Sequence, residues 1–275
     1  MQNDKINFSL IIPIGLMLFS FFFGAGNLIF PPVLGQMAGD NIGWGMLGFC
    51  LSGVGFPLLG VLAMAMKQSD NPDSIAMPMH PLYARAVTIL CALAIGPLFA
   101  IPRTAAVSFD TGIHSLLPAS CEAIGLPVYT VFFFVLTYFF SINPSKIIGH
   151  IGKFLSPMLL ICLAVLVVCV FVNPTGSLKM PNPDFAASPF FRGFQEGYNT
   201  MDLLAAILFG SITIKAIEAQ GITDKKVLTK LCSYAGLIAA FFLAIIYAAL
   251  AYTGALSINV FGVIPNGATL LSKIC

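Results

Sequence analysis

The chain has 275 residues, of which 58% are hydrophobic and 9% are charged, and its mean hydropathy is +0.95. A typical soluble domain carries about 25% charged residues, and a soluble fold of this length lacks the interior to bury so much apolar surface. The formal net charge is only +2, so composition excludes a soluble globular domain and indicates an all-α polytopic membrane protein.

Seven apolar runs approach or exceed the length of about 20 residues at which a helix crosses a bilayer. They cover residues 9–34, 42–66, 86–108, 127–142, 154–172, 200–220 and 231–254. No gap between them can contain a soluble domain, and the longest, 173–199, has four prolines and is typical of an external loop. We therefore expect a single transmembrane domain over residues 1–275 with about seven transmembrane helices.

The first run contains, from Gly24 to Pro32, the sequence GAGNLIFPP. Each Gly lowers helix propensity by about 1 kcal/mol relative to Ala, so we expect regular helix to lapse between Phe23 and Asn27. Such interruptions indicate substrate sites in secondary transporters. Exposed N–H groups suit a carboxylate, whereas carbonyls and the Asn27 side chain suit a cation such as Na⁺, placed at Ala25 and Asn27. The alternative is a proline-kinked helix with glycines at a tight helix contact.

The third run contains Gly96, Pro97 and Arg103, and the charged residue Asp110 follows just after its end. A charge at mid-bilayer costs roughly 2.5–3.5 kcal/mol or more, which makes an intramembrane arginine a functional candidate. Arg103 lies near the outer end of its run, where its side chain can also extend to the interface. Asp110, seven residues on, lies on the same helical face but too far away for a direct i, i+4 pair. Two roles stay open for Arg103: an anchor or structural ion pair, or a direct contact with a substrate or gate.

The sixth run opens on Asn199 and Asp202, which have the spacing of a helix capping box. An acidic residue also suits a helix N-terminus, so capping is one interpretation. The other is that Asp202, or the interruption at Gly210 and Ser211 after Phe209, lines a cavity opposite the first break.

The remaining polar residues indicate less. Lys215 and Glu218 have i, i+3 spacing and are typical of a solvated pair. The sequence contains no nucleotide-binding loop, catalytic triad or metal-ligand cluster. We expect no enzyme, no cofactor and no nucleic-acid partner.

Lys and Arg in the connections predict the orientation, because cytoplasmic loops carry an excess of both. With the N-terminus inside, nine fall on the cytoplasmic side and four outside, unlike a G-protein-coupled receptor, whose N-terminus lies outside. The inner set is Lys5, Lys67, Arg85, Lys146, Lys153, Lys215, Lys225, Lys226 and Lys230, and the outer set is Arg103, Lys179, Arg192 and Lys273.

Three blocks in this order resemble the signatures of the branched-chain amino acid:cation symporter family, the bacterial system II carriers for leucine, isoleucine and valine. They are residues 24–32, 96–104 and 197–202, joined by Asn143-Pro144-Ser145-Lys146 before the fifth run. The resemblance extends from about residue 8 to the end of the chain, and Asp110 stands where the family pattern has Glu.

The resemblance implies the five-plus-five inverted-repeat fold of the amino acid–polyamine–organocation superfamily, with broken first and sixth helices. Residues 1–172 would form the first repeat and residues 198–275 an incomplete second one. The first break maps onto Gly24, Ala25, Gly26 and Asn27, and the second lies between Tyr198 and Ser211. We expect Phe209, Gly210 and Ser211 to approach the first break at mid-membrane, with Arg103, Asp110 and Asp202 as gating or ion-pair residues.

The implied activity is secondary transport of branched-chain amino acids in symport with Na⁺ or H⁺ across the bacterial cytoplasmic (inner) membrane. Family members have about twelve helices, and this chain stops after seven. We therefore expect little leucine uptake from it alone. Two alternatives stay open: a non-functional or partner-dependent fragment of such a carrier, or a carrier of another small solute.

Overall fold

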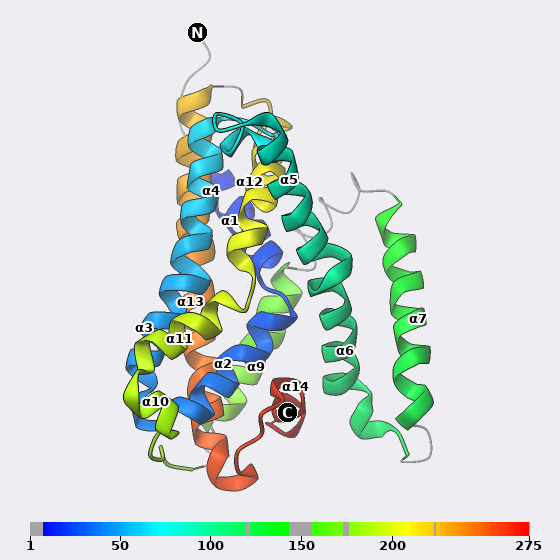
Figure 1. Ribbon diagram of the computed structural model, residues 1–275, viewed down its shortest axis with the longest axis vertical. Coiled ribbons are helices and arrows are strands. Elements are labelled where there is room, and N and C mark those ends of the chain that lie inside the picture. The colour runs from blue at the N-terminus through cyan, green and yellow to red at the C-terminus, as the bar shows by residue number, and fades with distance from the viewer. Residues whose placement is uncertain (1–7, 119–121, 143–155, 173–175, 223, 275) are drawn as a thin grey trace.

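The computed structural model describes residues 8–118, 122–142, 156–172, 176–222 and 224–274, which form helices joined by short connections (Figure 1). Each predicted apolar run coincides with a helix or with a helix interrupted by a break. Within the described residues, four helical stretches are long and apolar enough to cross a membrane, or five if a bent pair counts as one crossing. This number is below seven because one run is divided at the first break and another gives a helix of 17 residues. The all-helical, polytopic fold class is confirmed.

The first crossing is broken into α1 (Phe8–Phe22) and α2 (Ala25–Ala38). Gly24, with φ −114° and ψ −170°, is extended, so the predicted lapse of helix between Phe23 and Asn27 is confirmed. Pro31 and Pro32 do not end α2. Because proline has no N–H, they leave two carbonyls in the first turns of α2 without their usual helical partners.

The second and third crossings also contain irregular turns. The elements are η1 (Gly39–Asn41), α3 (Ile42–Cys50), η2 (Leu51–Gly55), α4 (Phe56–Lys67), η3 (Pro72–Ile75), α5 (Pro81–Leu93), η4 (Ala94–Leu98), α6 (Ala100–Gly112) and η5 (His114–Leu116). Gly39 has a φ of +49°, which turns the chain between α2 and α3. At η4, Gly96 has a ψ of −116° and Pro97 follows it, so the third crossing kinks there.

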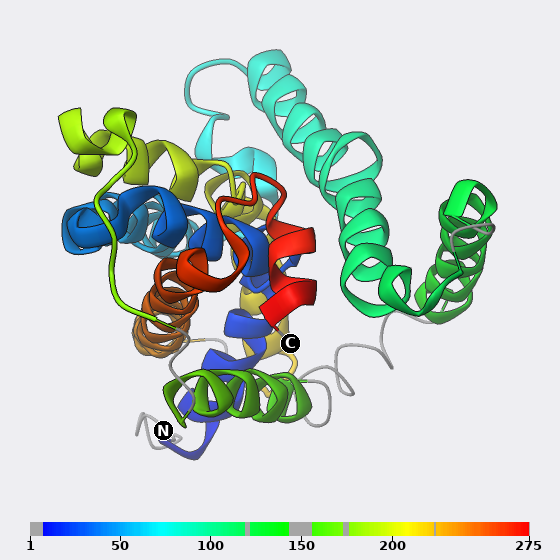
Figure 2. The same ribbon diagram turned by 90° about the horizontal axis from the view of Figure 1, so that it is seen from below.

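The later elements complete the bundle. They are α7 (Glu122–Ser141), α9 (Ser156–Val172), α10 (Pro183–Ala187), α11 (Pro189–Tyr198), α12 (Asp202–Glu218), α13 (Lys225–Phe261) and α14 (Gly267–Ile274). Figure 2 shows α6 and α7 on one side of the bundle. Large side chains of α7 such as Phe132 and Phe139 are exposed there, as in a helix that faces lipid. The predicted motif Asn143–Lys146 lies outside the described residues.

The 37-residue helix α13 organises the bundle, with α1, α2 and α4 packed along it. The Asp224 carboxylate accepts hydrogen bonds from the backbone N–H groups of Lys226 and Val227, which caps α13 and lowers the pKa of Asp224. Farther along, α2 and α13 approach so closely that a Cβ on Gly35 would overlap the carbonyl of Ala251. A Cβ on Gly254 would overlap the carbonyl of Pro32 in the same way. Small residues at these positions therefore allow the backbones to touch.

Substituting Gly254 with Ala should lower the free energy of unfolding by about 1–3 kcal/mol, because the added methyl group forces α2 and α13 apart. Gly112, at the end of α6, is the matched control, since nothing lies within 4 Å of a Cβ built there. Gly112→Ala should be neutral or stabilising because Ala favours helix by up to about 1 kcal/mol. The measurement is unfolding in mixed micelles, and equal effects of the two substitutions would contradict this packing.

Candidate functional site

The second break lies between α11 and α12, at residues 199–201. The two helices are bent by 45°, and Met201 has a φ of +67°, a left-handed conformation that ends regular helix. The break falls within the interval predicted for it, Tyr198 to Ser211. It occurs at the beginning of that interval and not at the Gly210-Ser211 pair.

The two breaks meet at three side chains, which we call the Asn27–Asp202–Tyr247 junction. The Asn27 amide nitrogen donates to Asp202 Oδ2 at 2.6 Å and also to the Tyr247 hydroxyl. The Tyr247 hydroxyl in turn donates to Asp202 Oδ2 at 3.2 Å. The three residues come from α2, α12 and α13 and are between 0% and 4% exposed. One carboxylate oxygen thus joins both broken helices to the central helix.

Asn27 uses both ends of its amide. Its side-chain oxygen accepts a hydrogen bond from the Gly24 N–H at 3.0 Å, which satisfies a backbone donor at the first break. Its side-chain nitrogen then donates to Asp202 and Tyr247 in the junction. The capping of α2 by its own third residue therefore fixes the direction in which the amide presents its donors to Asp202.

Arg103 connects the third crossing to the second break. Its Nη1 donates to the carbonyl of Asn199 at 3.1 Å, and its Nη2 donates to the carbonyl of Thr200 at 3.3 Å. Its guanidinium carbon also lies 5.4 Å from the ring centre of Phe30 on α2. The half-buried Arg103 thus contacts α2 and the break that precedes α12.

A cavity of about 190 Å³ lies between the breaks. Its lining includes Phe21, Phe22, Ala25, Arg103, Asp202 and Phe209. The Phe209 ring lies 5.3 Å from that of Phe21 and 5.7 Å from that of Phe22, measured between ring centres. The cavity thus has an aromatic wall and, on α6 and α12, one residue of each charge.

The structure brings most of the predicted site residues together. Gly24, Ala25 and Asn27 line the cavity, and Gly26 lies against Arg103, whose Nη2 would be 2.8 Å from a Cβ placed there. Because Gly26 has no side chain, the guanidinium can approach the first turn of α2.

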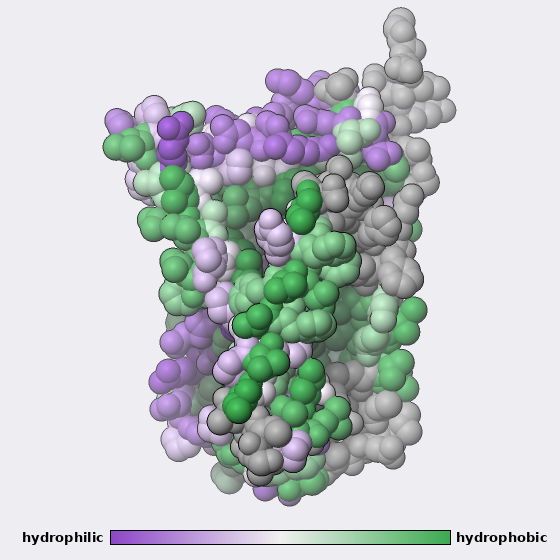
Figure 3. Space-filling view, turned by 90° about the vertical axis from the view of Figure 1, so that its right-hand side faces the viewer, coloured by the Kyte–Doolittle hydropathy of each residue, from purple (hydrophilic) through white to green (hydrophobic). Residues whose placement is uncertain are grey.

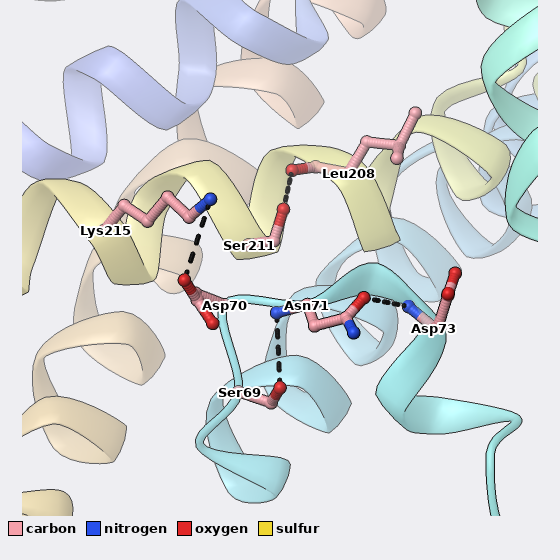
Figure 4. Close-up of polar contacts among 7 residues, drawn as sticks. All are labelled: Ser69, Asp70, Asn71, Asp73, Leu208, Ser211 and Lys215. Atoms are coloured by element: carbon pink, nitrogen blue, oxygen red, sulfur yellow. Dashed lines mark hydrogen bonds and ion pairs between the residues drawn. The ribbon is translucent and has the colours of Figure 1, made fainter.

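Gly210 and Ser211 lie elsewhere, so the expected approach to the first break holds only for Phe209. Gly210 packs against Met64 of α4. The buried Ser211 donates its hydroxyl to the Leu208 carbonyl at 2.7 Å, on the side of α12 that faces the loop after α4 (Figure 4). The reason is the 100° between successive helical residues, which turns the positions after Phe209 away from the cavity.

Two sets of charged residues that lie near each other in sequence do not pair with each other within the described residues. Within the described residues no ion pair joins Arg103 to Asp110, which is half-buried on α6. Lys215 pairs with Asp70 in the α4–α5 connection, at 3.6 Å, and not with Glu218 (Figure 4).

Sequence reasoning missed Tyr247 and Thr200. Tyr247 is fully buried in the last apolar run. A tyrosine in such a run is a possible signal, because its hydroxyl needs a partner when it is buried. Thr200 contributes its backbone carbonyl to Arg103, and a backbone group carries no residue-type signal.

Two broken helices that meet at a cavity, in a polytopic membrane protein, are an arrangement found in many secondary transporters. The chain belongs to the branched-chain amino acid transport protein family, whose sequence pattern matches residues 8–275. It is 45% identical over 273 residues to the branched-chain amino acid permease BrnQ of Bacillus subtilis (strain 168), covering 99% of this chain and 62% of the relative.

Other relatives agree with this assignment. The permease BraB of the same strain is 43% identical, with coverage of 95% and 58%. The permease BrnQ of Escherichia coli (strain K12) is 38% identical, with coverage of 95% and 59%. The chain thus spans about three-fifths of the length of these relatives. No solved structure matches it with significance.

Replacing Tyr247 with Phe should lower the free energy of unfolding by about 1–3 kcal/mol, because Asn27 and Asp202 each lose a hydrogen-bond partner in a buried place. Tyr234, exposed on the same helix, provides the control, and Tyr234→Phe should change stability by less than about 0.5 kcal/mol. Unfolding in mixed micelles measures both values. If Tyr247→Phe and Tyr234→Phe changed the free energy of unfolding equally, the junction would not contribute to stability.

Proposed function

We propose that this chain serves a secondary carrier that moves leucine, isoleucine and valine across the cytoplasmic membrane in symport with Na⁺ or H⁺. The observation that carries the proposal is the meeting of two broken helices at one cavity through the Asn27–Asp202–Tyr247 junction. Substrate and coupling-ion sites of many secondary transporters lie where discontinuous helices meet at the membrane midplane. The names of the relatives support the substrate class.

The cavity suits an amino acid with an apolar side chain. The N-terminus of α2 begins at its edge, and a helix N-terminus favours a carboxylate. The rings of Phe21, Phe22 and Phe209 offer an apolar wall for an isoalkyl group. A strongly charged side chain would have to leave water for these rings at a large free-energy cost.

The same place suits a coupling ion. The carbonyls of Asn27 and Leu28, which Pro31 and Pro32 leave without helical partners, are hard oxygen ligands of the kind Na⁺ takes. Asn27 is also one of the two residues, with Ala25, proposed to bind the ion. Asp202 adds a buried carboxylate that can receive a cation or a proton. Coupling through either ion therefore remains within the proposal.

Repeat organisation and orientation form part of the proposal. Residues 1–172 and 198–275 would form the two repeats. The first has the broken helix α1–α2 near its start, and the second begins at the break between α11 and α12, as expected for an inverted repeat. Figure 3 shows hydrophilic side chains gathered at the upper end of one face, above a mostly apolar belt. That end carries the α4–α5 connection, with Lys67 before it, and Lys215 lies close by, so we assign it to the cytoplasm.

Binding to the purified chain in lipid nanodiscs tests this function. Leucine, isoleucine and valine should bind saturably and in preference to lysine and aspartate. Sodium coupling should make leucine bind more tightly in NaCl than in choline chloride, whereas proton coupling should make it bind more tightly at low pH. Absence of saturable leucine binding under all these conditions, or equal binding of lysine, would contradict the proposal.

Phe209→Ala should weaken leucine binding about tenfold, because it removes part of the apolar wall, worth about 1.5 kcal/mol. Phe191→Ala is the matched control, since Phe191 is 73% exposed on α11 and is not among the residues that line the cavity. Titration with labelled leucine measures both affinities. A loss of affinity in the control variant alone would place the apolar pocket elsewhere.

A further inference from the structure

Arg103 is a charged residue inside a helical stretch long and apolar enough to cross a membrane, Pro81–Gly112, and each of its two amino groups uses one of its two hydrogens. They donate to the carbonyls of Asn199 and Thr200 at the second break. Its Nε is buried and has no hydrogen-bond partner. A buried, unsatisfied donor on a charged group is costly, so its retention at a cavity wall needs a reason.

No acidic side chain within the described residues lies within ion-pair distance of Arg103. Asp202 lines the same cavity and attracts Arg103 electrostatically, but it lies outside ion-pair distance, and its Oδ2 is occupied by Asn27 and Tyr247. A guanidinium is stabilised in apolar surroundings by an anion that accepts its N–H groups. A carboxylate that accepts the free N–H groups of Arg103 directly would have to enter the cavity that Arg103 lines.

We infer that Arg103 binds the carboxylate of the amino-acid substrate through the Nη hydrogens that the carbonyls of the second break leave free. This inference rests on the proposed function and adds a residue that fixes how the substrate is oriented. A guanidinium offers several donors in a rigid plane, so it can serve the break and a carboxylate simultaneously.

The surroundings favour this arrangement. Phe30 lies under the guanidinium carbon, and Gly26 leaves space for the head group beside the first turn of α2. A carboxylate placed there meets both Arg103 and the positive end of the α2 dipole. The substrate side chain then extends toward Phe21 and Phe209 on the same cavity wall.

The test compares L-leucine with L-leucinamide, which has the same side chain but no carboxylate. Wild-type chain in nanodiscs should bind leucine more tightly than leucinamide. Arg103→Gln should weaken leucine binding by about 10- to 100-fold, the range for a charge-assisted hydrogen bond, and should leave leucinamide binding little changed. Arg192→Gln, at an exposed arginine paired with Asp184, should keep the wild-type preference.

A merely structural role for Arg103 predicts something else, because loosening the second break would weaken both ligands equally. If Arg103→Gln keeps the wild-type preference for leucine, the inference is overturned and the proposed function stands. If wild-type chain binds neither ligand, the proposed function fails as well. Arg103→Lys keeps the charge but not the planar fork, so it should reduce the preference even where Arg103→Gln does not fold.

Discussion

Lipid offers no hydrogen-bond partner to the backbone groups that a broken helix exposes, at a cost of several kcal/mol for each group left unsatisfied. Both breaks in this protein meet that constraint with side chains, a nearby one at the first break and a distant one at the second. Asn27 satisfies the Gly24 N–H at the first break. Arg103 satisfies the carbonyls of Asn199 and Thr200 at the second. The positions of α2, α6 and α12 follow from these contacts.

The central helix α13 joins the two broken helices at the Asn27–Asp202–Tyr247 junction. Tyr247 bonds to both Asn27 and Asp202, so neither broken helix can shift without disturbing the other. Close backbone contact at Gly35 and Gly254 holds α2 against α13 below the junction. In the proposed carrier, the junction would be the fixed point around which other parts move, as alternating access requires.

The positions of the helices and of the first break could be predicted from the sequence. The length of an apolar segment predicts a membrane crossing, and the GAGN stretch has low helix propensity in any surroundings. The contacts that each helix makes with other helices across the bundle could not be predicted in the same way. Helical spacing gives relative faces but not which face meets the cavity, so Gly210 and Ser211 were expected beside a site that only Phe209 reaches. The left-handed Met201 has no residue-type signal, because such backbone conformations usually belong to Gly or Asn.

The central claim is that Asn27 and Asp202 fasten the two breaks to each other. A double-mutant cycle with Asn27→Ala and Asp202→Ala, measured as the free energy of unfolding in mixed micelles, tests it most directly. The account predicts a coupling of at least about 1 kcal/mol, since the side chains are in contact and buried. Asn27→Ala combined with Asp224→Ala, at the exposed start of α13, should be additive within about 0.5 kcal/mol. Additivity in the Asn27–Asp202 cycle as well would contradict the account.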